Sequence, residues 1–272
     1  MFNQISSQAS KLINLTKKHH NRSKTKVIAI TSGKGGVGKS TFTANLSYNF
    51  SLLNKKVLVI DADIGLANMQ ILFDIRPKYT INDYLEHNIN INNILIKTKY
   101  ENISLVAGRS GHNYLLQNSQ NQFSRVIKEI VSLERYDYIL VDTGAGLSHQ
   151  VQEFLDISDE IIAVTTTDPS ALTDVYALIK MLSLSKKRIF MVFNHTKTYR
   201  IGETITQSLI NLASKNKLNK NFMVKYIGNI TSDLNIQTTG RLRKLFVKEF
   251  IGSKSALDLD KIVNVLRKEI KC

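Results

Sequence analysis

Short apolar runs alternate with amphipathic segments along most of the chain. Seven runs are predicted strands: Val27–Ile30, Val57–Ile60, Ile103–Ala107, Tyr138–Val141, Ile161–Val164, Ile189–Phe193 and Tyr226–Ile230. Several are apolar throughout, which is typical of strands buried on both faces of a parallel sheet. Helical spacing predicts four helices between them: Phe42–Leu53, Gln120–Leu133, Thr173–Ser185 and Ile205–Lys217. The alternation predicts an α/β fold with a doubly wound, mostly parallel sheet flanked by helices, and a ligand site at the carboxyl ends of the strands.

The two ends of the chain have patterns of their own. Residues 3–15 are predicted to form a short helix with an apolar stripe, and residues 16–26 are basic and lack acidic residues. We therefore divide the chain into residues 1–25, a helix with a basic linker, and residues 26–272, the main domain. Near the end, an apolar stripe runs beside basic residues and contains Leu259, Ile262, Val263, Leu266 and Ile270. This stripe either packs in the core, which we favour, or binds lipid.

The first strand runs directly into a glycine-rich stretch. Gly33, Gly38, Lys39 and Ser40 satisfy the pattern G-x-x-x-x-G-K-[ST], and Gly35 and Gly36 lie between them. Glycines allow backbone N–H groups to converge on phosphate oxygens, and the following helix presents its N-terminus to the same anion. Lys39 is placed to reach the β- and γ-phosphates, and the Ser40 hydroxyl to ligate Mg²⁺. The stretch predicts a P-loop that binds a nucleoside triphosphate with Mg²⁺.

Two further apolar strands end in carboxylates. Asp61 and Asp63 follow the second predicted strand, and Asp142 follows the fourth. Near a γ-phosphate and Mg²⁺, such groups orient or deprotonate water, or hold the metal; Asp142 fits an acceptor behind the Mg²⁺, and Asp61 is a further candidate for the metal. The alternative is that Asp61, Asp63 and Asp142 cap the helices that follow.

Composition bounds the class of protein. The 272 residues carry a net charge of +15, and the single cysteine is Cys272. A lysine-rich, dispersed surface without an aromatic-interleaved basic motif does not predict nucleic acid as a partner. Without a long apolar run or an export signal, we expect a cytoplasmic protein, with peripheral contact at the inner face of the cell membrane left open.

Lys34 adds a family resemblance. K-G-G-x-G-K-[ST] resembles the deviant Walker A box of the MinD/ParA class of ATPases, and D-A-D-I-G-L-A-N after the second strand and D-T-G-A-G after the fourth resemble its two switch loops. The resemblance implies ATP as the nucleotide, an ATP-dependent homodimer, and a Lys34 that reaches the partner's nucleotide. The alternative is a loop lysine that neutralises phosphate charge in cis.

The same resemblance implies roles for individual residues. Asp63 matches the aspartate that positions the hydrolytic water, and Asp142 matches the aspartate behind the Mg²⁺ ligand Ser40. The phosphate loop continues through Val37 and Thr41, and Asn194 matches an asparagine that contacts adenine. Ser232 and Asp233 match a second loop beside the adenine, although Thr231 replaces the usual proline. Asn194 has the alternative role of simply ending a strand.

Within that class, three segments resemble the FlhG (FleN, YlxH) branch, which governs flagellar number and placement. They are D-T-G-A-G, T-D-P-S-A-L-T-D-V-Y-A-L-I-K and the N-terminal Q-A-x-x-L of Gln8, Ala9 and Leu12, where Ser7 replaces an aspartate. The branch implies the flagellar GTPase FlhF as partner through that N-terminal box, with flagellar switch or transcription-regulator proteins as further candidates. Three other functions stay open: a ParA-like partitioning ATPase on DNA, a MinD-like division-site ATPase, and an ATP-binding adaptor that does not hydrolyse.

Overall fold

The computed structural model describes residues 25–63, 67–109, 121–186, 188–198 and 200–270. The predicted N-terminal helix, its Gln8-Ala9-x-x-Leu12 box and most of the linker lie outside these residues. The strands are Lys26–Ser32 (β1), Val57–Ala62 (β2), Ile96–Lys97 (β3), Ile103–Val106 (β4), Tyr138–Ala145 (β5), Glu160–Thr165 (β6), Arg188–Thr196 (β7) and Met223–Thr231 (β8). The helices are Lys39–Leu52 (α2), Met69–Leu72 (α3), Ile81–His87 (α4), Ile91–Asn93 (η1, a 3₁₀ turn), Gln122–Ser132 (α5), His149–Ile157 (α6), Pro169–Leu182 (α7), Ile201–Lys215 (α8), Leu234–Arg241 (α9), Phe246–Glu249 (α10) and Lys254–Ile270 (α11).

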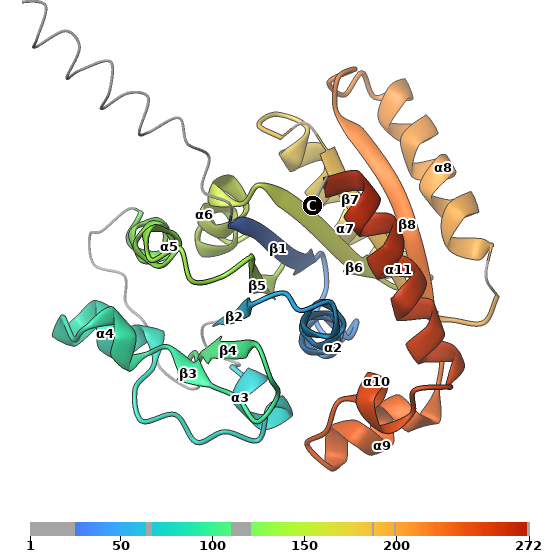
Figure 1. Cartoon of the computed structure of the whole chain (residues 1–272). Helices are drawn as coiled ribbons and strands as arrows, with labels where there is room; N and C mark the ends of the chain where they lie inside the picture. Colours follow the sequence, from blue (N-terminus) through green and yellow to red (C-terminus); the bar gives the residue numbers. More distant parts are fainter. Residues whose placement is uncertain (1–24, 64–66, 110–120, 187, 199, 271–272) are drawn as a thin grey trace, which may run out of the picture.

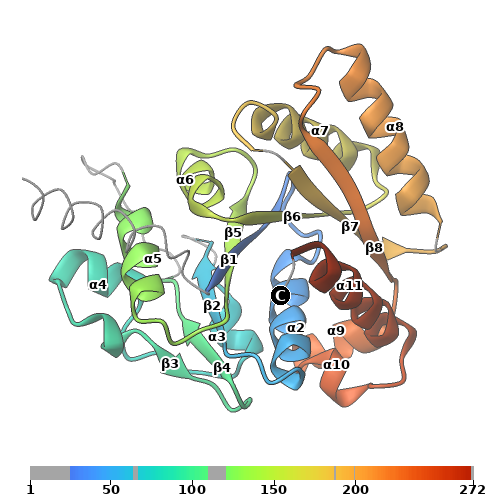
Figure 2. The ribbon, with the colours of Figure 1, turned by 45° about the horizontal axis from the view of Figure 1, so that its top comes forward.

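The strands form one sheet in the order β3-β4-β2-β5-β1-β6-β7-β8. Every neighbouring pair is parallel except β3 and β4, which are antiparallel. On one side of β1 the chain runs outward through β6, β7 and β8, and on the other side β5 returns to lie between β1 and β2. Helices cover both faces of the sheet (Figures 1 and 2). This is the predicted doubly wound α/β fold.

Burial on both faces explains why the strands are apolar throughout. Ile28 and Ile30 of β1 face α2, α3, α10 and α11 on one side of the sheet. Val27 and Ala29 of the same strand belong to the clusters on the other side, under α5, α6, α7 and α8. Alternate residues of a strand point to opposite faces, so both sets must be apolar.

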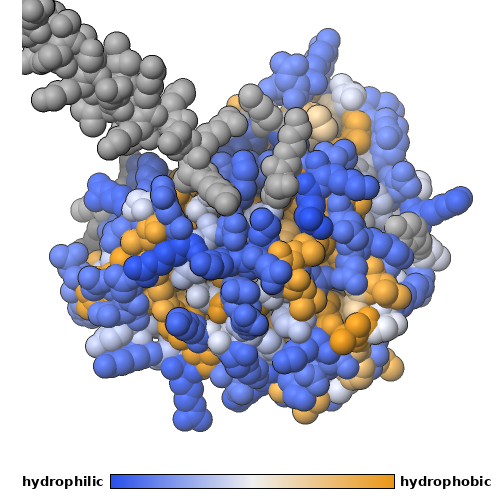
Figure 3. Space-filling model, viewed as in Figure 1, coloured by the Kyte–Doolittle hydropathy of each residue, from blue (hydrophilic) through white to orange (hydrophobic). Residues whose placement is uncertain are grey.

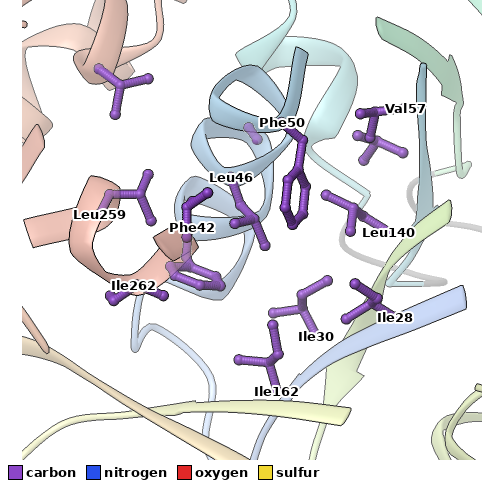
Figure 4. Packing of buried hydrophobic residues seen from close by; sticks show 14 of the residues in the cluster. Ile28, Ile30, Phe42, Leu46, Phe50, Val57, Leu140, Ile162, Leu259 and Ile262 are labelled. Carbon is purple, nitrogen blue, oxygen red and sulfur yellow. The ribbon is translucent and has the colours of Figure 1, made fainter. Parts of the chain in front are cut away.

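Helix α2 is the central element of the first face. Phe42, Leu46 and Phe50 point from it toward the sheet and toward α11 (Figure 4). The Phe50 ring stacks on Tyr138 of β5 with centroids 4.3 Å apart. Because α2 starts at the phosphate loop, this packing anchors the loop to the core.

All seven predicted strands are present; six are two to four residues longer than predicted, and β4 is one residue shorter. The four predicted helices are present too, although α7 begins at Pro169 rather than Thr173. Asp168 caps α7 and proline occupies its first turn, a start signal that the apolar spacing alone does not show. The two-residue strand β3, the short helices α3, α4, α9 and α10, and the nine-residue α6 were not predicted.

Helix α11 settles the location of the C-terminal stripe. Leu259, Ile262, Val263, Leu266 and Ile270 are all buried in the core shared with α2 and β8. The stripe therefore packs in the domain, as favoured from the sequence. Figure 3 shows a mainly hydrophilic face with smaller apolar areas between. Among the described helices, none has the length and apolar character that crossing a bilayer requires.

Candidate nucleotide site

The predicted site residues meet at the carboxyl ends of three central strands. Strands β2, β5 and β1 are neighbours, so the loops that follow them share one edge of the sheet. These loops and the start of α2 and α6 enclose a cavity of about 560 Å³. Its lining residues are Ser32, Gly35, Gly36, Val37, Gly38, Lys39, Ser40, Thr41, Ala62, Asp63, Asn68, Gly144, Ala145, Ser148, Gln150 and Val151. Most of the predicted phosphate loop is thus on the cavity wall.

Two glycines of the loop hold conformations that other residues rarely adopt. Gly36 has φ +78° and Gly38 has φ +88°, both in the left-handed region. Gly33 is needed for a different reason, because a Cβ there would lie 2.5 Å from the backbone of Asp174 in α7. The loop is therefore shaped by its glycines and seated against α7.

Lys39, Asp142 and Thr43 form a buried cluster below the loop. The Lys39 ammonium donates to Asp142 Oδ1 at 3.0 Å, and the Thr43 hydroxyl donates to the same oxygen at 3.1 Å. Asp142 is completely buried, and its other oxygen, Oδ2, is buried without a hydrogen-bond partner. A buried carboxylate oxygen normally has a partner, so an unpaired one beside a phosphate loop indicates a position for a donor supplied by a ligand.

Asp63 lies at the mouth of this cluster. Its Oδ2 is 4.0 Å from the Lys39 ammonium, and its side chain is one-quarter exposed. A Cβ on Gly144 would lie 3.6 Å from Asp63 Oδ1, so the loop after β5 approaches the same carboxylate. Partial burial raises the pKa of Asp63, Lys39 opposes that rise, and Asp142 adds to it. Asp63 is thus the predicted carboxylate that borders the open cavity.

Asp61 has different surroundings. It is fully buried, and its carboxyl accepts from the backbone N–H of Met69 at 2.9 Å and of Asp63 at 3.4 Å. Burial, with Asp142 directly opposite across β2 and β5, raises its pKa to about 7. These contacts hold the loop between β2 and α3, and the assignment of Asp61 to the metal stays a prediction.

The residues present fit Mg²⁺ with a nucleoside triphosphate. Ser40 presents a hydroxyl at the cavity, and the unpaired Asp142 Oδ2 lies in the buried cluster behind Lys39. Hydroxyl, carboxylate, water and phosphate oxygens are the ligands that Mg²⁺ takes when it binds with a nucleotide. Lys39 and the loop amides supply donors for the phosphates.

Lys34 extends away from the buried cluster. Its exposed ammonium donates to the Ser170 hydroxyl at 2.6 Å, at the start of α7. Ser170 in turn donates to Asp168 at 2.5 Å, and this hydrogen bond lowers the pKa of Asp168. Within one chain, therefore, Lys34 contacts α7.

The residues predicted for the adenine side are not on the cavity wall. Asn194 is buried, and its Nδ2 donates to the carbonyl of Val37 at 2.8 Å. Asp233 caps α9 by accepting from Asn235 N, and it also accepts from the Ser255 hydroxyl. The backbone N–H of Ser232 donates to Thr196 O at 3.0 Å. The adenine-side assignments stay predictions.

Two contributions to the site were missed from the sequence. Thr43 lies one helical turn after Lys39 on α2, which places it on the same face as Lys39, so the spacing could have revealed it. Ser148 and Gln150 reach the cavity from the start of α6, and Ser148 caps that helix. The serine before a helical stretch was the available signal.

Comparisons with known proteins agree with this geometry. The AAA domain family matches residues 25–196. Flagellum site-determining protein YlxH of Helicobacter pylori is 35% identical over 269 residues, which cover 96% of this chain and 90% of that protein. Antiactivator FleN of Pseudomonas aeruginosa is 29% identical over 237 residues, which cover 85% of this chain and 82% of that protein.

A solved structure gives the same result for the fold. The septum site-determining protein MinD complexed with Mg-ADP, from Pyrococcus horikoshii, matches with a TM-score of 0.77 and 26% identity. The match covers 90% of this chain and 97% of that one. The sequence match over nearly the whole chain and the shared fold show that the chain belongs to the MinD/ParA family of P-loop ATPases, in the branch that includes YlxH and FleN.

Proposed function

We propose that the chain is an Mg²⁺- and ATP-dependent switch that dimerises around ATP, hydrolyses it, and regulates flagellar number or placement. Membership of the YlxH and FleN branch supports the flagellar role. The MinD structure with Mg-ADP supports the choice of nucleotide and metal. The buried Lys39–Asp142 pair under a glycine-rich cavity is the observation that carries the proposal.

That pair has the chemistry of a phosphate sensor. Lys39 is held by carboxylates whose charge it neutralises, so the γ- and β-phosphates of ATP compete for the same ammonium. Mg²⁺ would supply charge neutralisation of the phosphates, and Ser40 would hold it through its hydroxyl. Asp142 Oδ2, the carboxylate oxygen that lacks a partner, would accept hydrogen bonds from groups around the metal. Binding of ATP would in this way change the contacts that Lys39 makes with Asp63 and Asp142, and with them the loops after β2 and β5.

Hydrolysis needs a water in line with the γ-phosphate. Asp63 borders the cavity and keeps a partly exposed carboxylate, so it can accept a hydrogen bond from that water. Lys39, and Lys34 from the partner subunit, would stabilise the charge that develops on the phosphate oxygens.

The main experiment uses Asp63→Ala and size-exclusion chromatography with ADP or ATP. Removing the water-positioning carboxylate should leave ATP binding and the ATP dimer in place while phosphate release falls at least about 100-fold. Asp137→Ala is the matched control, because Asp137 is exposed to the same extent, 25%, and lies away from the cavity. Wild-type turnover in Asp63→Ala would move the catalytic role elsewhere, and a flat trace for the wild type would favour the non-hydrolysing adaptor.

The partner is proposed to be the flagellar GTPase FlhF, bound through Gln8, Ala9 and Leu12. A glutamine can orient a water or a phosphate-side group in a GTPase. The test adds a synthetic peptide of residues 1–22 to the cognate GTPase. Acceleration that is lost in Gln8→Ala supports the proposal, whereas no acceleration at saturating peptide contradicts it.

One observation favours a second candidate, a ParA-like ATPase on non-specific DNA. The net charge of +15 would attract a polyanion. Retention on DNA that requires ATP and falls steeply with salt would support this candidate over the flagellar one.

A further inference from the structure

Asn194 contacts the phosphate loop rather than the cavity. It lies near the end of β7, two strands away from β1, and its side chain is buried. Its Nδ2 donates to the Val37 carbonyl at 2.8 Å, across 157 residues of sequence. Its Oδ1 accepts from the backbone N–H of His195 at 2.9 Å, and this second bond fixes which end of the amide faces the loop.

The contact orients one peptide group of the loop. The described residues contain no cis peptide bond, so the Val37 C=O and the Gly38 N–H point in opposite directions. With the carbonyl held against Asn194, the Gly38 N–H points to the other side of the peptide. Val37 and Gly38 line the cavity and Asn194 does not, which indicates that this side is the one where phosphate binds.

Gly38 is adapted to the same contact. A Cβ at Gly38 would lie 2.2 Å from Asn194 Nδ2, closer than real atoms approach. Gly38 also has φ +88° and precedes α2 without a side-chain cap. The glycine therefore allows the asparagine to come close, and the asparagine holds a peptide that would otherwise be free to rotate.

We propose that Asn194 is a positioning residue for the phosphate loop: through the Val37 carbonyl it aims the Gly38 N–H at the phosphates, whatever the base. The proposal rests on the proposed function, in that the cavity must bind a nucleoside triphosphate. It differs from the adenine contact that the family resemblance implies, because the effect is on phosphate affinity.

The test compares a ligand that has a base with one that has none. Asn194→Ala is titrated with Mg-ATP and, by competition, with inorganic tripolyphosphate. Loss of one buried hydrogen bond should lower the affinity for Mg-ATP and for tripolyphosphate by the same factor, about tenfold. Asn229→Ala is the matched control, because Asn229 is a buried asparagine on the neighbouring strand β8 whose Nδ2 bonds to Thr196 Oγ1, away from the loop. A lower affinity for Mg-ATP with unchanged affinity for tripolyphosphate would overturn the proposal and favour a contact between Asn194 and the adenine base.

A second measurement needs no nucleotide. The Phe42 N–H donates to the Gly38 carbonyl at 2.9 Å, so its hydrogen exchange reports on this turn. In the nucleotide-free protein, exchange at Phe42 should be several-fold faster in Asn194→Ala than in Asn229→Ala or the wild type. Unchanged exchange at Phe42 in Asn194→Ala would contradict the proposal. If the wild type does not bind ATP but exchange at Phe42 is still faster in Asn194→Ala, the result counts against the proposed function alone. If Asn194→Ala does not fold, Asn194→Ser, which keeps a small polar side chain, is measured in the same two ways.

Discussion

Lys39 carries two roles at one position. Its ammonium is the predicted phosphate ligand, and in the nucleotide-free chain it is the cation that pairs with fully buried Asp142. Removing one partner of a buried pair leaves the other charge without compensation. The residue predicted to bind phosphate therefore also stabilises the fold.

We predict that Lys39→Ala abolishes ATP binding and lowers the free energy of unfolding by about 3 kcal/mol. Isothermal titration calorimetry and urea unfolding measure the two effects. The double variant Lys39→Ala with Asp142→Asn should recover much of the stability, because the uncompensated charge is gone, yet still not bind ATP. Retained nucleotide affinity in Lys39→Ala would rule out its place on the phosphates.

Asp61 makes stability depend on pH. Its pKa rises from an ordinary 3.8 to about 7 in the folded chain, mainly through burial and next through Asp142. The folded state therefore holds a proton that the unfolded state loses, and stability falls as pH rises from about 4 through about 7.

We predict that Asp61→Asn, which mimics the protonated carboxyl, removes this slope and leaves the nucleotide-free protein more stable than wild type above pH 7. The limit set by the pKa difference is about 4 kcal/mol. Urea midpoints between pH 4 and pH 8 measure the effect, with exposed Asp74→Asn as control. A parallel pH dependence in wild type and Asp61→Asn would show that Asp61 is not the source.

At the scale of elements, the apolar stripe of α11 packs in the core of the domain. Leu266 is fully buried against the sheet and α2, while Leu257 on the same helix is 49% exposed. Because the stripe already packs in the core, it is not presented to a lipid surface in this conformation.

We predict that Leu266→Ala lowers the free energy of unfolding by 2–5 kcal/mol, as cavity formation in a core does. Leu257→Ala on the exposed side should change it by less than about 1 kcal/mol. Urea unfolding of both variants, with cosedimentation on anionic vesicles, separates core packing from lipid binding. If Leu266→Ala kept full stability but lost vesicle binding, the lipid interpretation of α11 would be correct.

At the scale of the whole molecule, Lys34 distinguishes a monomeric from a dimeric use of the site. In one chain its ammonium donates to the Ser170 hydroxyl, and Lys34 does not line the cavity. An exposed lysine at the rim of a nucleotide site is free to exchange this partner for a phosphate of a second subunit.

We predict that Lys34→Ala binds ATP as a monomer with near wild-type affinity but loses the ATP-dependent dimer, because its phosphate contact lies in trans. Ser170→Ala, which removes the contact within the chain, should keep both properties. Size-exclusion chromatography with light scattering in ADP and ATP measures them. Normal ATP-driven dimerisation of Lys34→Ala would establish the cis alternative.

Much of the fold and of the phosphate side of the site was determined by the sequence alone. Strands buried on both faces must be apolar throughout, so β1, β2 and β5 stood out locally. The glycines and Lys39 follow β1 directly, Asp63 follows β2, and Asp142 lies in the second half of β5. Since parallel strands end at one edge, their order along the chain was enough to bring these groups together.

Other features were decided only by the tertiary structure. Lys34 meets Ser170 across 136 residues, and Asn194 meets Val37 across 157, because the order β1-β6-β7 brings the ends of strands that are distant in sequence to one edge of the sheet. The pKa of Asp61 is raised by its burial and, next, by its register opposite Asp142, and the core location of α11 depends on β8. Local patterns determine which residues are apolar or charged, but strand order and register are set by the packing of the whole chain, and they decide which of those residues touch.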